Sequence, residues 1–213
     1  MLSSLKKLLR LLRKIMNITR RPYYGFVQGH SHITDSQLHK LDKLVDIQSS
    51  RNSDAFESEF ANYLGVEHAT SFASGRMGFY ALLQSLKVKS GNEVILTGST
   101  CAVMANAVLR VGAKPVYADI SPKTFGTCPL SVEGLITRDT KVIVAQHSFG
   151  IPCDIEKIAK VARERGIFLI EDCALSFDSS LNGTVLGLFG DAALFSFDHT
   201  KPINMMIGGM ICT

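Results

Sequence analysis

The sequence predicts an α/β domain with a mostly parallel, seven-stranded sheet that carries helices on both faces. Predicted strands and helices alternate from residue 69 onward, which is the pattern of a parallel sheet. The strands are short apolar runs without polar alternation, as in residues 142–145 and 167–170, and such runs fit strands that are covered on both faces. Of the 213 residues, 46% are hydrophobic and 20% charged, so the chain can bury one substantial core.

The chain starts with a basic segment, residues 1–24, that predicts an amphipathic helix. Between residues 5 and 16 the leucines, Ile15 and Met16 fall on one face of a helix, and the lysines and arginines fall on the other. The segment is too short and too charged to span a bilayer. Three interpretations stay open: peripheral contact of residues 1–21 with an anionic membrane surface, packing on its own domain or a partner, and a disordered tail.

The charge balance and the cysteine content bear on whether the rest of the chain binds nucleic acid or metal, and on its cellular location. Seven of the 23 basic residues precede Asp35, and no acid does, so the rest has 16 basic against 19 acidic residues. This balance gives no indication of nucleic-acid binding. The five cysteines have no metal-ligand spacing and form no close pair, which favours a reduced, cytoplasmic location and predicts no metal site.

Residues 25–66 predict a helical segment ahead of the sheet domain, residues 67–213. Pro22 and Gly25 end the basic helix expected in residues 1–24. Two further helices are expected over residues 37–48 and 54–64. Ser53 or Asp54 is the expected N-cap of the second helix, and Gly65 ends it.

The body then predicts seven strands and four helices. The strands are expected at residues 69–72, 93–96, 115–119, 142–146, 167–171, 192–197 and 209–212. The helices are expected at residues 77–86, 102–111, 132–135 and 155–165. About a dozen residues without a clear helix join the last two strands, so one of the two is a candidate for antiparallel pairing.

Polar residues at strand ends are the candidate site, because ligands of such sheets bind at the carboxyl ends of the strands. Asp172 follows a buried run, and an acid there is also common as a helix cap or turn residue. Ser74, Gly75 and Arg76 open a helix after the first strand, where backbone N–H groups can hold a phosphate, although this signal is weak alone. His147 is interpreted as a buried histidine whose ring is satisfied by the backbone.

Lys201 follows the strand that contains Ser196. A lysine at one strand end with an acid at the preceding one is the arrangement that pyridoxal phosphate chemistry needs. The amine forms a Schiff base with the cofactor aldehyde, and the carboxylate keeps the pyridine nitrogen protonated. A nucleotide-binding domain without this cofactor is disfavoured, because no Gly-x-Gly-x-x-Gly follows the first strand.

Nine segments in order resemble the DegT/DnrJ/EryC1/StrS sugar aminotransferases, a branch of the aspartate aminotransferase fold that depends on pyridoxal phosphate. The segments are Phe56–Phe60, Ser74–Gly75, Gly91–Ile95, Pro115–Ile120, Gln146–Gly150, Ile170–Ala174, Gly190–Phe197, Thr200–Lys201 and Gly208–Met210. The resemblance implies that the body is the cofactor-binding large domain of this family.

The resemblance also implies the roles of individual residues. Lys201 would form the internal aldimine and move protons, and Asp172 would pair with the pyridinium nitrogen. Ser196 and the amides of Gly75 and Arg76 would hold the phosphate. The reaction implied moves an amino group from glutamate to a nucleotide-linked keto sugar, as in cell-surface polysaccharide biosynthesis, and the family acts as a homodimer.

Three cofactor-contacting positions depart from the family pattern. Arg76 replaces a usual threonine, Cys101 an aromatic ring that stacks on the cofactor, and Leu175 a glutamine or histidine. Family members also continue into a small carboxyl-terminal domain, which this sequence does not contain, so the expected large domain is incomplete. Two hypotheses therefore remain: an aminotransferase, and a catalytically inactive relative that serves as a membrane- or partner-associated scaffold.

Overall fold

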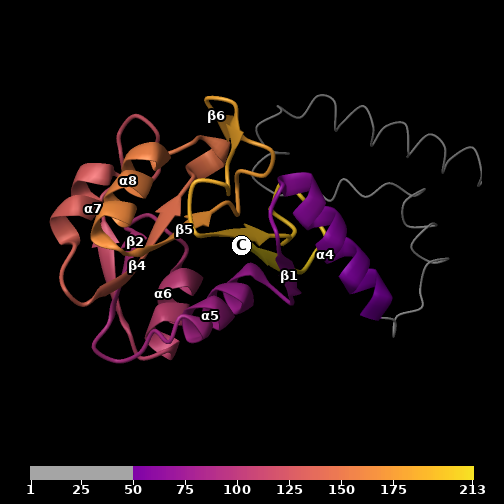
Figure 1. Ribbon diagram of the computed structural model, residues 1–213, viewed down its shortest axis with the longest axis horizontal. Helices are drawn as coiled ribbons and strands as arrows, with labels where there is room; N and C mark the ends of the chain where they lie inside the picture. The colour runs from indigo at the N-terminus through magenta and orange to yellow at the C-terminus, as the bar shows by residue number, and fades with distance from the viewer. Residues whose placement is uncertain (1–49) are drawn as a thin grey trace, which may run out of the picture.

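The computed structural model describes residues 50–213 (Figure 1). The expected basic helix in residues 1–24 and the expected helix 37–48 lie outside the described residues. Within residues 50–213, no helix is both long enough and apolar enough to cross a membrane.

The predicted seven-stranded sheet is confirmed. Its strands are β1 (Ala69–Phe72), β2 (Glu93–Thr97), β3 (Lys114–Ala118), β4 (Thr140–Gln146), β5 (Phe168–Asp172), β8 (Ala192–Ser196) and β9 (Gly209–Cys212). Their order across the sheet is β1-β9-β8-β5-β4-β2-β3. The pairs β2–β3, β2–β4, β4–β5 and β5–β8 are parallel, whereas β9 runs antiparallel to both of its neighbours. The antiparallel strand expected near the end of the sequence is therefore β9.

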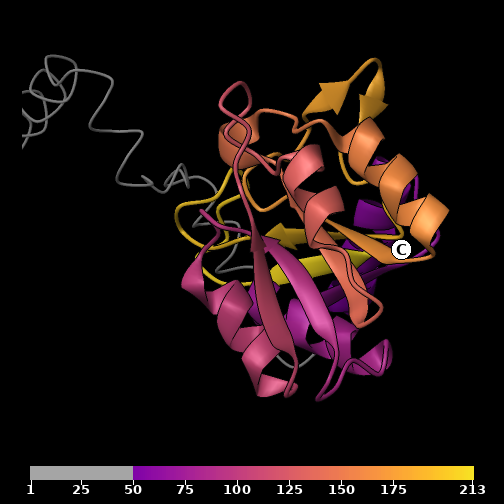
Figure 2. The same cartoon turned by 90° about the vertical axis from the view of Figure 1, so that its left-hand side faces the viewer.

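Helices cover both faces of the sheet, as predicted (Figures 1 and 2). They are α4 (Ser50–Leu64), α5 (Gly75–Ser85), α6 (Ala102–Arg110), α7 (Pro129–Leu135) and α8 (Ile155–Arg165), with a short 3-10 turn at Ser148–Gly150. The expected N-cap of α4 was wrong, because the helix continues back through Ser53 to Ser50. At the end of α8, Gly166 adopts a left-handed backbone with φ of 62°, the usual way in which glycine ends a helix.

Two apolar clusters form the core, one on each face. Val142 and Val144 of β4 pack with α5 and α6, while Ile143 and Ala145 pack with α7 and α8. Successive side chains of a strand point to opposite faces, so this alternation is expected. In β5, Leu169 and Ile170 divide in the same way between the two clusters.

A small hairpin between β5 and β8 was not predicted from the sequence. It consists of β6 (Ser180–Leu181) and β7 (Thr184–Val185), which pair antiparallel around Asn182 and Gly183. Both turn residues have positive φ, 52° and 83°. Asn-Gly is the strongest short signal for such a turn, so the dipeptide could have predicted it.

Candidate functional site

A cavity of about 800 Å³ lies at the carboxyl ends of the parallel strands. Its walls come from the segments that follow β1, β2, β3, β4, β5 and β8. All seven sequence-predicted site residues line it, namely Gly75, Arg76, Cys101, Asp172, Leu175, Ser196 and Lys201. The cavity stands where ligands of open α/β sheets bind, because the strand ends bring together residues that are distant in sequence.

Asp172 is the buried acid of the cavity. It ends β5 and is 7% exposed, and its Oδ1 accepts one hydrogen bond, 3.0 Å long, from the backbone N–H of Ala174. A hydrogen bond to the backbone N–H two residues later is typical of an aspartate in a turn. Asp172 is therefore both a turn residue and a residue of the cavity wall. Burial raises the pKa of the Asp172 carboxyl, while the Ala174 N–H and the charge of Lys201 oppose that rise.

Lys201 lies in the segment between β8 and β9. Its backbone N–H donates to the carbonyl of Asp198 at 2.9 Å, which forms a turn directly after the strand. The half-buried side chain lines the same cavity as Asp172 and favours the ionised form of that acid. One amine and one buried carboxylate therefore belong to a single site.

The start of α5 forms the candidate phosphate end of the cavity. Ser74 caps the helix through a 3.4 Å bond from the Met77 N–H to its Oγ. Gly75 packs closely against β8, because an added Cβ would stand 3.1 Å from the Phe195 carbonyl and 3.3 Å from the Ser196 Cβ. The first amides of a helix and a neighbouring hydroxyl suit an anion.

Gly209 is needed for the close approach of β9 to the start of α5. A Cβ at this position would overlap the backbone nitrogen and Cα of Gly75. A bridge between Ser74 and Gly208 joins the same two segments. Gly208 and Gly209 therefore set how closely β9 approaches the start of α5.

The positions that depart from the family pattern form another part of the wall. Cys101 directly precedes α6 and is exposed, Leu175 is half-buried, and Arg76 is exposed on the first turn of α5. Three other cysteines are buried, and burial raises the pKa of Cys153 and Cys212 to about 12 and that of Cys173 well above its ordinary value. Cys101 is thus the cavity thiol that a reagent can reach.

The mouth of the cavity is apolar, which the sequence analysis did not predict. Phe149 is 76% exposed, and Phe125, Met206 and Ile207 are exposed as well. Phe125, Phe149 and Met206 have φ between 56° and 67°, the left-handed region that glycine favours. Such backbone positions concentrate at binding sites, and no periodicity in the sequence signals them.

His147 was expected to be a buried histidine satisfied by the backbone, and this is confirmed. Its ring is fully buried, and Nδ1 accepts a 3.2 Å hydrogen bond from the backbone N–H of Cys153. The structure adds a partner that sequence reasoning missed, since Nε2 lies 3.1 Å from the Glu171 carboxylate.

The arrangement therefore offers an amine, a buried carboxylate and an anion-binding helix end around one cavity. Together they suit a ligand that carries a carbonyl group, a basic ring nitrogen and a phosphate, because each of these groups meets its chemical complement.

Comparison with known proteins agrees with this chemistry. Residues 33–213 match the model of the DegT/DnrJ/EryC1/StrS aminotransferase family. GDP-perosamine synthase of Vibrio cholerae is 36% identical over 158 residues, which are 74% of this chain and 43% of that protein.

Solved structures are similar as well. The structure of DesI with its TDP-sugar product is 32% identical with a TM-score of 0.78, over 87% of this chain and 48% of that one. NtdA of Bacillus subtilis with bound cofactor PMP is 28% identical with a TM-score of 0.77, over 85% and 42%. The chain spans about half or less of the length of these proteins.

Proposed function

Because the chain belongs to the DegT/DnrJ/EryC1/StrS aminotransferase family, we propose that it is the cofactor-binding part of a pyridoxal-phosphate-dependent aminotransferase acting on a nucleotide-linked keto sugar. The observation that carries this proposal is the meeting of Lys201, Asp172 and the start of α5 at one cavity. One relative is named as a 3-aminotransferase of a UDP-linked sugar, and the similar NtdA was solved with PMP, the amine form of the cofactor.

The cavity residues fit this cofactor. Asp172 is buried with one hydrogen bond from the described residues, so its charge is poorly compensated until a cation meets it. A protonated ring nitrogen is such a cation. Gly75 leaves no room for a side chain beside Ser196, so a phosphate there would meet backbone N–H groups and a hydroxyl directly.

Pyridoxal phosphate, when bound, supplies an aldehyde that condenses with amines and a ring that accepts electrons from the adjacent carbon. In our proposal, the Lys201 Nζ would hold the cofactor and would also be the group that accepts and returns a proton during the reaction. The Asp172 carboxylate would keep the ring nitrogen protonated. Ser196, Gly75 and Arg76 bind and orient the phosphate, with the guanidinium of Arg76 in place of a hydroxyl.

The relatives and the lining of the cavity support the proposed substrate class. DesI was solved with a TDP-sugar product, and GDP-perosamine synthase is also named for a nucleotide-linked sugar. The apolar mouth formed by Phe125, Phe149, Met206 and Ile207 offers two aromatic rings and two aliphatic side chains against which a base or sugar ring can pack. We propose glutamate as the amino donor.

We further propose that the protein acts in the cytoplasm as a homodimer, in biosynthesis of cell-surface polysaccharide. An inactive scaffold is the less favoured alternative, because the described cavity keeps both the amine and the buried acid. The membrane contact expected of residues 1–21 stays a prediction, since these residues lie outside the described part.

The test is spectroscopic. The purified chain is incubated with pyridoxal phosphate, and the visible band of protein-bound cofactor is recorded before and after L-glutamate is added. Borohydride reduction followed by peptide mass analysis then locates the attachment. We expect a band that glutamate shifts and a reduced adduct on Lys201.

Two variants sharpen this test. Lys201→Ala removes the amine, so the band and the adduct should disappear. Lys157→Ala is the matched control, because Lys157 is an exposed lysine of α8 that pairs only with Asp154 among the described residues. A wild-type chain without the band, or a Lys201→Ala chain that keeps it, contradicts the proposal.

A further inference from the structure

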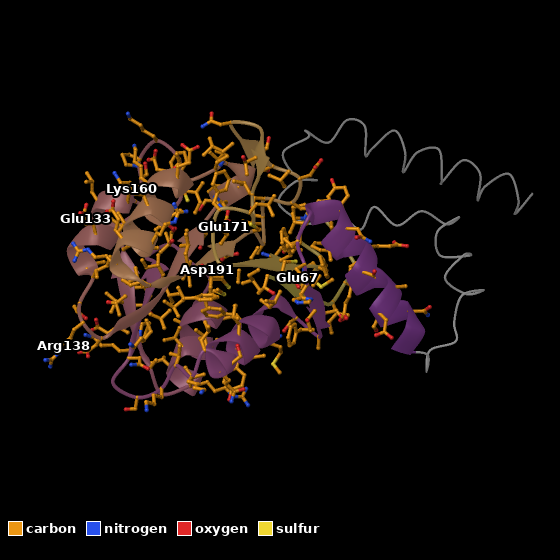
Figure 3. All side chains as sticks on the ribbon, viewed as in Figure 1. Glu67, Glu133, Arg138, Lys160, Glu171 and Asp191 are labelled. Carbon is orange, nitrogen blue, oxygen red and sulfur yellow. The ribbon has the colours of Figure 1, made fainter. Side chains whose placement is uncertain are left out.

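Glu171 is a buried acid for which the proposed chemistry has no role. It directly precedes Asp172 in β5, is fully buried, and lies in the middle of the molecule (Figure 3). Because strand side chains alternate, Glu171 points to the face covered by α7 and α8, whereas Asp172 points the other way. The two neighbouring carboxylates thus lie on opposite faces of the sheet.

The Glu171 carboxylate accepts four hydrogen bonds. The backbone N–H groups of Phe189 and Gly190 donate to Oε1 at 2.6 and 2.8 Å. The backbone N–H of Gly187 donates to Oε2 at 2.9 Å, and Nε2 of His147 lies 3.1 Å from the same oxygen. Two oxygens offer about four acceptor positions, so the carboxylate is saturated.

This saturation argues against a metal site. Atoms of His147, Glu171 and Cys173 lie within 4.8 Å of one another, a grouping that by residue type suits a cation. No acceptor position of Glu171 is free, however, and both ring nitrogens of His147 have partners. Burial also keeps the Cys173 thiol protonated, which is not the metal-binding form.

The hydrogen bonds fix the orientation of His147. Since Nδ1 accepts the N–H of Cys153, the ring proton is on Nε2 and is donated to Glu171. The backbone N–H of His147 in turn donates to the carbonyl of Asp172 at 3.2 Å. The end of β4 is therefore tied to the end of β5 twice, by the Glu171 side chain and by the Asp172 backbone.

We propose that Glu171 and His147 are positioning residues for Asp172: their buried hydrogen bond holds the ends of β4 and β5 together and thereby fixes the direction in which the Asp172 carboxylate enters the cavity. Neither residue touches the cofactor in this proposal. The inference rests on the proposed function, because Asp172 matters there as the partner of the ring nitrogen.

Two variants at position 147 test the hydrogen bond itself. His147→Gln places an amide N–H near the position of Nε2 and can still donate to Glu171. His147→Asn is shorter, keeps an acceptor for the Cys153 N–H, and cannot reach Glu171. Glu171→Gln removes the acceptor side, and Asp172→Asn is the reference for lost contact with the ring nitrogen.

The measurements are the dissociation constant of pyridoxal phosphate and the wavelength of its bound band, because a merely structural role would change neither in a folded variant. We expect His147→Asn and Glu171→Gln to bind the cofactor at least tenfold more weakly, with a band moved toward that of Asp172→Asn. His147→Gln should stay within about threefold of wild type.

The outcomes separate the inference from the proposed function. Wild-type affinity and band in both His147→Asn and Glu171→Gln overturn the inference and leave the function intact, as does a His147→Gln variant as weak as His147→Asn. If Glu171→Gln does not fold, the pair of variants at position 147 decides.

If the wild-type chain binds no cofactor, the proposed function fails, and amide hydrogen exchange decides the inference. The backbone N–H of residue 147 should then exchange at least tenfold faster in His147→Asn than in His147→Gln if the side-chain bond holds the two strand ends together. Equal exchange overturns it.

Discussion

Glu171 and Asp172 are adjacent and both buried, but they differ in the number of hydrogen-bond donors around their carboxylates. Four donors surround the Glu171 carboxylate on one face of the sheet, while the Asp172 carboxylate has a single N–H donor among the described residues and borders a cavity. The first arrangement stabilises a fold and has no capacity left for a ligand. The second leaves a charge incompletely compensated, which is what a binding site for a cation requires.

The largest expected effect is a difference in stability between two alanine variants. Glu171→Ala leaves the buried N–H of Gly187 and the half-buried N–H groups of Phe189 and Gly190 without their acceptor, and should lower the free energy of unfolding by about 3–5 kcal/mol. Asp172→Ala removes a buried, poorly paired acid and should change it by less than about 1 kcal/mol. Urea unfolding measures the stability of both variants, provided that their m-values are equal. Equal losses of stability would contradict the different roles given to the two acids.

The second prediction concerns the backbone that shapes the cavity on the Asp172 side. Gly209→Ala places a methyl group against the backbone of Gly75, which cannot move without disturbing the start of α5. We expect a loss of about 3 kcal/mol in stability and much weaker cofactor binding. Gly134→Ala is the control, because nothing lies within 4 Å of its added Cβ and alanine favours the helix α7. Unaltered unfolding and cofactor affinity in Gly209→Ala would show that this approach is not needed.

The third prediction concerns how the titration of Asp172 changes stability with pH. Burial raises the pKa of Asp172 above its ordinary value of 3.8, so the ionised acid destabilises the fold at pH values above the raised pKa. As pH falls from the raised pKa toward 3.8, the folded protein takes up the proton and this destabilisation disappears. The stability advantage of Asp172→Asn over wild type should therefore be largest at neutral pH and vanish below 3.8.

Glu93 provides the control of opposite sign for that titration. Hydrogen bonds from Lys114 and Thr137 lower the pKa of Glu93. The stability that Glu93 contributes is therefore present above its ordinary pKa and is lost as pH falls through the lowered value. Glu93→Gln should cost a small amount at neutral pH, since the pair is at the surface. Urea midpoints over a pH series measure both variants, and parallel curves for Asp172→Asn and wild type would contradict the raised pKa.

The smallest expected effect is a gain. Cys101→Phe restores an aromatic ring at the cavity wall and should tighten cofactor binding by about 0.5–1.5 kcal/mol, or roughly 2- to 12-fold. Cys101→Ala is the control and should leave the affinity close to that of wild type. Fluorescence titration with pyridoxal phosphate measures all three. An unchanged constant in Cys101→Phe would mean that this wall does not face the cofactor ring.

The sequence predicted the strands well because burial on both faces leaves a plain apolar signal, as in Val142–Ala145. Asp172 and Lys201 could be placed at one cavity because parallel strands end at the same edge. The partners of Glu171 could not be foreseen, since three of them are backbone N–H groups of residues 187–190, and no periodicity predicts the path of that loop. The start of α4 was missed because its first turn carries no clear capping signal for Ser50.

The position of β9 has a consequence for how the chain acquires its structure. Among residues 50–213, β9 is the only strand paired with β1, so Ala69 lies opposite Cys212, which is far away in the sequence. During synthesis β1 must wait, with its edge unpaired, until residues 209–212 have left the ribosome. Contacts of such long sequence separation slow folding, and an exposed strand edge invites association with other chains. The position of β9 therefore leaves the edge of β1 unpaired until residues 209–212 are available.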